Sequence, residues 1–257
     1  MPPPRERALS SLEQITHIHD YPCSLEENSV NFSDLQFDIS DEVLSLGLTG
    51  VYFTIGGLNN STSNSEFDEL IERAEKEILA ALSKDLIKQD PILGGFRKLH
   101  EAVGRSNRKN IAAPENLLAA LLQTGHIPRV NLLVDIYNLV SIRSRLALGA
   151  HDIARIAGNV HLRMTTGSET FVPLGAPEAK PIAAGEYAYI DDSNEVLCRL
   201  EVRQVEKTKV TLETTECFYV VQGNAATSEA FLMATVGELI TLTKKFCGGT
   251  ERLIYPP

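Results

Sequence analysis

Residues 128–156, PRVNLLVDIYNLVSIRSRLALGAHDIARI, constrain the fold more than any other part of the chain. Their apolar side chains recur at helical spacing and are dense enough to predict a buried helix. Asn131, Asp135 and Asn138 fall on one side of this helix and are predicted to project together. Ser141 is also set among the apolar residues. Because a buried polar group without a hydrogen bond costs about 1–3 kcal/mol, these residues indicate either an internal polar network or one wall of a ligand site.

The helix is predicted to end near residues 148–149, which places His151 and Asp152 beside the polar stripe. There an imidazole could orient a water or a ribose hydroxyl. Structural alternatives remain open: Asp152 has the position of a helix N-cap, and His151 that of a half-buried loop residue. For Asn131 and Asn138, hydrogen bonds that tie the helix to neighbouring backbone carbonyls are the favoured alternative to ligand contact.

The rest of the chain predicts an α+β fold. A strand, a short helix and a second strand are expected within residues 35–58, and amphipathic helices over residues 65–82, 91–103 and 114–123. Strand patterns follow at residues 159–164, 169–174, 186–190, 195–203 and 216–223. A last helix at 228–246 and a final strand at 251–255 complete the pattern. We therefore predict a mostly antiparallel sheet packed against helices.

Residues 1–30 lack a periodic apolar pattern and are rich in Pro, Ser and Glu. We expect a mobile N-terminal extension there, followed by a single domain over residues 31–257. His17, His19, Asp20 and Cys23 lie close together in this extension. Structural zinc needs four ligands and no second pair is near, so we predict neither a metal site nor a cofactor.

Net charge is −10, which disfavours a nucleic-acid partner because phosphate binding depends on Lys and Arg. A local basic cluster that includes Arg105, Arg108 and Lys109 points the other way, and either a solvated loop or a phosphate contact would account for it. Arg203 and Lys209 belong to a second basic group. A local patch of this kind can bind RNA on an acidic protein, with strong salt dependence.

The chain lacks the marks of a membrane or exported protein. No apolar run approaches the roughly 20 residues that span a bilayer, so no membrane-spanning helix is expected. The four cysteines are widely spaced and form no C-x-x-C pair. We expect reduced thiols and a cytoplasmic location.

Two long runs carry a resemblance to a known family. VDIYNLVSIRSRLALGAHDIARIAGNVHLRM and VLCRLEVRQVEKTKVTLETTECFYVVQG resemble the tRNA-editing domain of the phenylalanyl-tRNA synthetase β subunit, and more closely its freestanding relatives without an aminoacylation domain. The resemblance covers residues 96–223, and its most specific pieces are VDIYN, GAHD-x-x-RI and TKVT-x-ET. It implies an editing-domain-like fold, a tRNA partner and hydrolysis of the ester that joins a wrong amino acid to the tRNA 3′ end.

Such an ester is already activated, so a positioned water, hydrogen bonds to the oxyanion and a selective pocket suffice. This agrees with a sequence that has no G-x-S-x-G motif. The chain departs from the synthetase pattern: the family's histidine falls at Gly149 and its glutamate at Val220. Either another amino acid is the substrate, or the protein binds without hydrolysis. One branch of the freestanding relatives is thought to clear canavanine from arginine tRNA, which implies a cationic amino acid.

The resemblance and the residue pattern together give the candidate site. Asp135 and Asp152 could receive a cationic side chain as a pair of carboxylates. Glu201 and Arg203 alternate along one strand pattern and share a face. The predicted catalytic residues are His151 and Asp152. The predicted substrate contacts are Asn131, Asp135, Asn138, Ser141 and Glu201, and the predicted tRNA contacts are Arg105, Arg108, Lys109, Arg203, Lys209 and Thr211. The alternatives are a binding module for RNA, aminoacyl-tRNA or a small ligand and, on the sole hint of the extension, a structural subunit.

Overall fold

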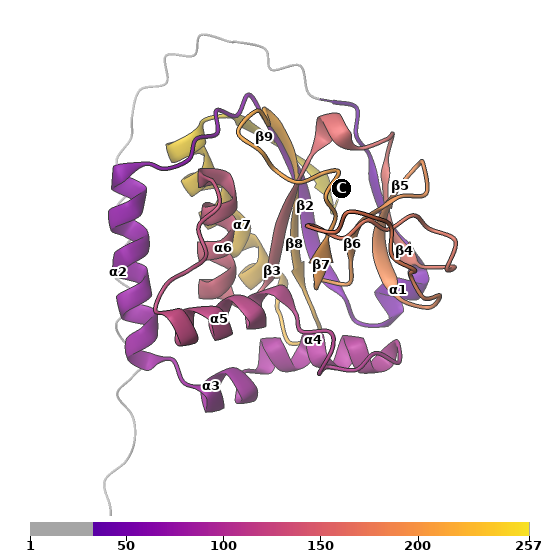
Figure 1. Cartoon of the computed structure of the whole chain (residues 1–257), viewed down its shortest axis with the longest axis horizontal. Helices are drawn as coiled ribbons and strands as arrows, with labels where there is room; N and C mark the ends of the chain where they lie inside the picture. The colour runs from indigo at the N-terminus through magenta and orange to yellow at the C-terminus, as the bar shows by residue number, and fades with distance from the viewer. Residues whose placement is uncertain (1–32, 257) are drawn as a thin grey trace, which may run out of the picture.

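The computed structural model describes residues 33–256 (Figure 1). The predicted N-terminal extension and the cluster from His17 to Cys23 lie outside these residues. The described chain forms three layers: helices, a four-stranded sheet and a five-stranded sheet. The predicted α+β class is confirmed, and the predicted sheet is divided into two.

The four-stranded sheet is the middle layer. Its order is β3 (Ala147–Asp152), β8 (Glu216–Gly223), β2 (Thr49–Gly56) and β9 (Thr250–Tyr255), with antiparallel neighbours throughout. Side chains alternate between its faces, as the two-residue period of a strand requires. On β8, Tyr219 and Val221 join the core beneath the helices, whereas Phe218 and Val220 join the core between the sheets.

The five-stranded sheet is the outer layer. Its order is β1 (Phe37–Ile39), β4 (Val160–Met164), β5 (Tyr187–Asp191), β6 (Val196–Arg199) and β7 (Arg203–Gln204). β1 and β4 are parallel, and the other neighbours are antiparallel. Aromatic rings join the two sheets: Phe37 stacks on Tyr52 with ring centroids 4.0 Å apart, and Tyr52 in turn meets Tyr189.

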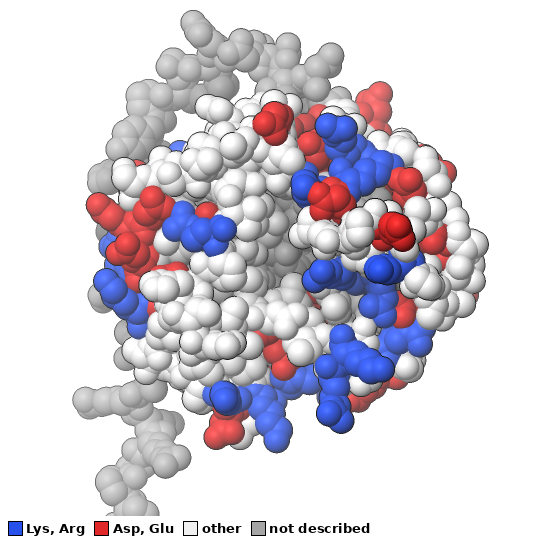
Figure 2. Space-filling view, viewed as in Figure 1, with Lys and Arg blue, Asp and Glu red and all other residues white. Residues whose placement is uncertain are grey.

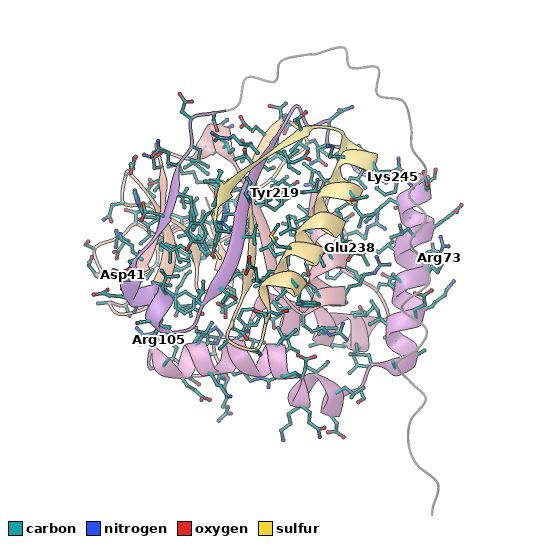
Figure 3. The ribbon with its side chains drawn as sticks, turned by 180° about the vertical axis from the view of Figure 1, so that it is seen from behind. Asp41, Arg73, Arg105, Tyr219, Glu238 and Lys245 are labelled. Carbon is teal, nitrogen blue, oxygen red and sulfur yellow. The ribbon has the colours of Figure 1, made fainter. Side chains whose placement is uncertain are left out.

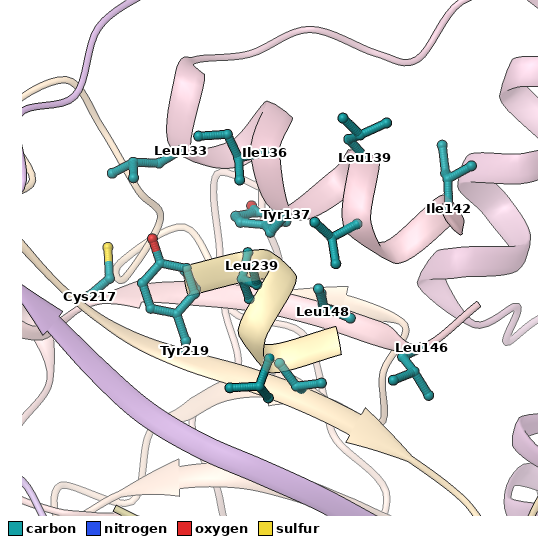
Figure 4. Packing of buried hydrophobic residues seen from close by; sticks show 14 of the residues in the cluster. Leu133, Ile136, Tyr137, Leu139, Ile142, Leu146, Leu148, Cys217, Tyr219 and Leu239 are labelled. Carbon is teal, nitrogen blue, oxygen red and sulfur yellow. The ribbon is translucent and has the colours of Figure 1, made fainter. Parts of the chain in front are cut away.

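Helices lie on the other face of the four-stranded sheet: α2 (Ser65–Ala81), α5 (Ala113–Thr124), α6 (Leu132–Ser144) and α7 (Glu229–Cys247). Helix α4 (Pro91–Ala102) runs below both sheets in Figure 1, and its Phe96 and Leu99 join the core between them. Helix α3 (Lys84–Gln89) packs against α4 and α5, α1 (Asp41–Ser45) lies between β1 and β2 in the chain, and a 3₁₀ turn forms at Ile153–Arg155. α6 and α7 pack on the sheet through buried apolar side chains, among them Ile136 and Leu139 of α6 and Leu239 of α7 (Figure 4). From behind, α7 crosses the sheet and its Lys245 reaches Glu66 of α2 at 2.6 Å (Figure 3).

The central helix begins and ends at defined caps. Asn131 accepts a hydrogen bond from the Val134 amide at 3.1 Å, and Arg145 ends the helix in the left-handed conformation with φ 64°. The chain then enters strand β3 at once. GAHD therefore lies in an edge strand, and the prediction that it follows a helix running to residues 148–149 is wrong.

Other local predictions also need correction. Residues 169–174 form no strand and make only isolated bridges at Thr170 and Pro173. Helix α3 was not predicted. Within residues 33–256, Cys198, Cys217 and Cys247 are free thiols. No helix in that part of the chain is long and apolar enough to cross a membrane.

Candidate functional site

A cavity of about 280 Å³ lies between the two sheets, beside the edge strand β3. Strands β3 and β8 form one side, and the β6–β7 turn faces them; α5 and α6 close one end. Figure 2 shows the hollow near the centre of the face, over β3 and β7 in Figure 1. Its volume lies just below the usual range for ligand pockets, which is roughly 300–1,000 Å³. The cavity therefore fits a ligand of amino-acid size.

Gly149 gives the cavity its open wall. The alternation along β3 places Gly149 and His151 on the face that turns toward the second sheet. A Cβ added at Gly149 would meet no atom within 4 Å. The missing side chain therefore leaves room for a ligand beside the imidazole.

A network of buried hydrogen bonds forms the base of the cavity. Glu201, only 5% exposed, accepts from Tyr187 Oη at 2.6 Å and Gln222 Nε2 at 2.9 Å. His100 Nε2 donates to the other carboxylate oxygen. Gln222 Oε1 in turn accepts from Tyr189 Oη at 2.5 Å. A buried carboxylate is tolerated here because several donors replace the water it has lost.

His100 supplies the charge that balances Glu201. Burial lowers the pKa of His100, but the hydrogen bond and the charge of Glu201 outweigh this effect and raise the pKa above its ordinary value. His100 lies 1% exposed on α4, and its Nδ1 is 3.2 Å from Asn107 Oδ1 in the following loop. The pair thus connects the base of the cavity with the loop that carries Arg105, Arg108 and Lys109.

His151 meets the cavity as a neutral ring. Burial lowers its pKa to about 3. Its Nδ1 lies 2.8 Å from Thr208 Oγ1 and 3.3 Å from Gln204 Nε2, which also donates to the Ala150 carbonyl at 2.7 Å. An amide N–H beside Nδ1 favours the tautomer with the proton on Nε2. Nε2 has no hydrogen-bond partner among residues 33–256, so His151 offers the cavity a neutral donor.

Cys198 lines the cavity but is no nucleophile. Burial, reinforced by the charge of Glu201, raises the pKa of its thiol to about 12. Its Sγ donates to the Leu200 carbonyl at 3.3 Å. The described part of the chain also contains no group of three or more His, Cys, Asp or Glu side chains arranged to hold a metal ion.

The structure brings together only part of the predicted site. Asn138, His151, Glu201 and Arg203 line the cavity. Ser141 does not, because its hydroxyl donates to the Leu146 carbonyl at 2.7 Å within the core.

The remaining predicted polar residues are engaged in structural contacts. Asn131 caps α6 and donates to the Val210 carbonyl at 3.2 Å. Asp135 accepts from Arg129 Nε at 2.7 Å and from the Val130 amide at 2.8 Å. Asn131 and Asp135 therefore follow the alternative of an internal polar network, and the prediction that they form a wall of the ligand site with Asn138 is wrong.

Asp152 is a helix N-cap, as its structural alternative predicted, and it does not line the cavity. It caps the 3₁₀ turn by accepting from the Ala154 amide at 3.0 Å, and it accepts from Thr214 Oγ1 at 2.8 Å. Since Asp135 is also absent from the lining, the predicted carboxylate pair does not face the cavity.

Some of the basic residues near the site have ion-pair partners within the described residues and others do not. Arg105 pairs with the buried Glu186, and Lys209 pairs with Glu206. Arg108 and Lys109 are exposed, and their side chains have no ion pair or hydrogen bond within the described residues. The side chains of two other predicted contacts are bound to backbone: Arg203 donates to the Leu174 carbonyl at 3.0 Å, and Thr211 Oγ1 accepts from the Glu213 amide at 3.3 Å. Blue side chains gather below and to the right of the hollow in Figure 2.

Several polar residues of this site were not predicted from the sequence, among them His100, Gln204 and Gln222. A signal existed for Gln222, because it follows Phe218 and Val220 at the two-residue period of β8 and so shares their face. His100 lies beside Leu99 on the buried face of α4 and gave no comparable signal.

Comparisons with known proteins point to one family. The model of the family described as B3/4 domain matches residues 97–235. The phenylalanine–tRNA ligase beta subunit of Mycoplasma genitalium is 32% identical over 108 residues, which are 42% of this chain and 13% of that protein. A crystal structure of an N-terminal fragment of the phenylalanyl-tRNA synthetase beta subunit from Pyrococcus horikoshii aligns at 17% identity and TM-score 0.47, covering 87% of this chain and 52% of the fragment. The chain thus spans a small part of the curated relative.

Proposed function

The chain belongs to the B3/4 domain family, and we propose that it is a hydrolase that releases a wrongly attached amino acid from tRNA. The observation that carries the proposal is the cavity beside β3, where a neutral imidazole and the buried amide of Gln222 line a space of amino-acid size. The tRNA as partner is supported by the name of the relative, a phenylalanine–tRNA ligase subunit, and by the exposed Arg108 and Lys109.

In the proposed reaction, water attacks the carbonyl of the aminoacyl ester. His151 Nε2–H donates to the developing oxyanion, a role in which a neutral donor in a dry site is effective. The lining contains no free base among the described residues, because Glu201 is paired with His100 and the pKa of His151 is too low. With no protein base, the positioned water gives its proton to the departing ribose oxygen as the ester C–O bond breaks, and the products are the free amino acid and tRNA with a free terminal ribose hydroxyl.

We propose a neutral amino acid as the substrate in place of the cationic one. A cationic side chain needs an unbalanced carboxylate, and within residues 33–256 the cavity offers only Glu201, whose charge His100 balances. Asp135 and Asp152 do not line the cavity.

The experiment is amino-acid release from a panel of misacylated tRNAs by wild type, His151→Ala and a control, Arg73→Ala. Arg73 is exposed on the distant helix α2. Loss of one oxyanion donor lowers kcat by about 10²–10³-fold, and we expect that loss for His151→Ala alone. Binding of every tRNA without release by wild type would contradict the proposal.

That outcome would favour a second candidate, a module that binds aminoacyl-tRNA without turnover. The specific observation in its favour is the low pKa of His151 together with the engagement of Glu201, which leaves no group in the described lining ready to accept a proton.

A further inference from the structure

Gln222 lies at the base of the cavity as a fully buried amide. It is 0% exposed on β8, opposite the small residue Ala147 on β3, and both line the cavity. Its Nε2 donates to Glu201 Oε2 at 2.9 Å, and its Oε1 accepts from Tyr189 Oη at 2.5 Å.

The chemistry of the neighbours fixes the orientation of this amide. The Glu201 carboxylate only accepts hydrogen bonds, and it already takes donors from His100 and Tyr187. The amide group that faces it must therefore be the NH₂. A reversed amide would set its oxygen against the carboxylate, which only accepts, and the Tyr189 hydroxyl would have to turn to Tyr52 Oη, 3.2 Å away.

One N–H of Gln222 is then left over. A side-chain amide has two N–H donors, and only the one toward Glu201 is bonded among residues 33–256. Burial without an acceptor carries a desolvation cost. A donor that is held rigidly, buried and incompletely bonded in the wall of a cavity is ready for an acceptor from outside the chain.

We propose that the second Nε2–H of Gln222 binds a neutral acceptor oxygen of the ligand. The identity of that ligand as an aminoacyl group rests on the proposed function. Two oxygens have this chemistry: the aminoacyl carbonyl and a hydroxyl on the amino-acid side chain. A hydrocarbon group at the same point would leave the N–H without an acceptor. A cation there would be repelled by the partial positive charge of the N–H. The site therefore disfavours both.

Binding of non-hydrolysable analogues tests this contact. The probes are 3′-deoxyadenosines that carry threonine or valine through a 3′-amide. The variant is Gln222→Met, which keeps the volume and removes the donor. The control is Thr243→Val, which removes a buried hydroxyl of α7 that does not line the cavity.

We expect Gln222→Met to weaken binding at least tenfold while Thr243→Val leaves it unchanged. Weakening of the threonyl analogue alone assigns the contact to a side-chain hydroxyl, and equal weakening of both assigns it to the carbonyl. Unchanged affinity of both analogues for a folded Gln222→Met protein overturns the proposal.

A crystal structure of the unliganded protein tests Gln222 independently of any tRNA activity. We expect an ordered water in the cavity within hydrogen-bonding distance of Nε2. A protein acceptor at that N–H, or Oε1 turned toward Glu201, overturns the proposal. If no analogue binds wild type and the water is present, the proposed function fails and the Gln222 donor stands.

Discussion

His151 shows how burial sets the chemistry of a single residue. The ring is 2% exposed and its pKa is lowered to about 3, so it is neutral wherever the protein is folded near neutral pH. The sequence predicted a histidine beside a ligand and did not predict its charge. Charge depends on the surrounding dielectric, which the assembled sheets create.

The titration of His151 gives a prediction for stability. In the unfolded chain the imidazole takes up a proton near pH 6.5, and in the folded chain only near pH 3. The unfolded state therefore binds more protons between these values, and this group lowers stability as pH falls through that window. We expect the urea midpoint of wild type to drop more from pH 7 to pH 5 than that of His151→Gln. Equal drops would contradict the burial of a neutral ring.

Helix α6 shows what an element's pattern can and cannot reveal. Its position, its burial and the asparagine at its start follow from periodicity and capping. The direction of its polar side chains does not, because the helix is enclosed by α5, α7 and the sheet. Periodicity predicted that Asp135 contacts a ligand, but its carboxylate accepts hydrogen bonds from Arg129 and the Val130 amide instead.

Asp135→Asn separates a structural role from a binding role. The substitution weakens the contact with Arg129 and leaves a buried group with poorer partners, so we expect unfolding free energy to fall by about 1–3 kcal/mol. Affinity for the threonyl and valyl analogues is expected to stay within twofold, because Asp135 does not line the cavity. Denaturant unfolding and analogue titration measure the two effects. If Asp135→Asn lost affinity for the analogues while its free energy of unfolding stayed unchanged, Asp135 would have to contact the ligand.

At the scale of the whole molecule, the site depends on how two sheets meet. Local patterns predicted the α+β class, most helices and several strands. They did not predict that Glu201, in the turn between β6 and β7, meets Gln222 of the other sheet and His100 of α4. These contacts join residues far apart in sequence, and no local pattern specifies such a pairing. Gly149 and Val220 were identified only through the family resemblance.

The charge distribution gives a prediction for tRNA binding. The chain carries net charge −10, yet Arg108 and Lys109 are exposed beside the loop that reaches His100. Each phosphate contact that is removed reduces the slope of log affinity against log salt by about one. We therefore expect the double variant Arg108→Ala, Lys109→Ala to reduce the slope of log affinity against log salt by about two. Lys207→Ala is the matched control because Asp191 and Glu195 already pair with Lys207, and an equal reduction in that control would contradict a specific contact.

The most direct measurement is amino-acid release from misacylated tRNA by wild type, Gly149→Ala and Gly149→Leu. A Cβ at residue 149 meets nothing within 4 Å, so the alanine variant keeps the fold and most of the cavity, whereas leucine fills it. If the cavity beside β3 is where hydrolysis occurs, wild type and Gly149→Ala release a neutral amino acid and Gly149→Leu, still folded and still bound to tRNA, is at least tenfold slower. Release by Gly149→Leu at the wild-type rate would show that the reaction takes place elsewhere.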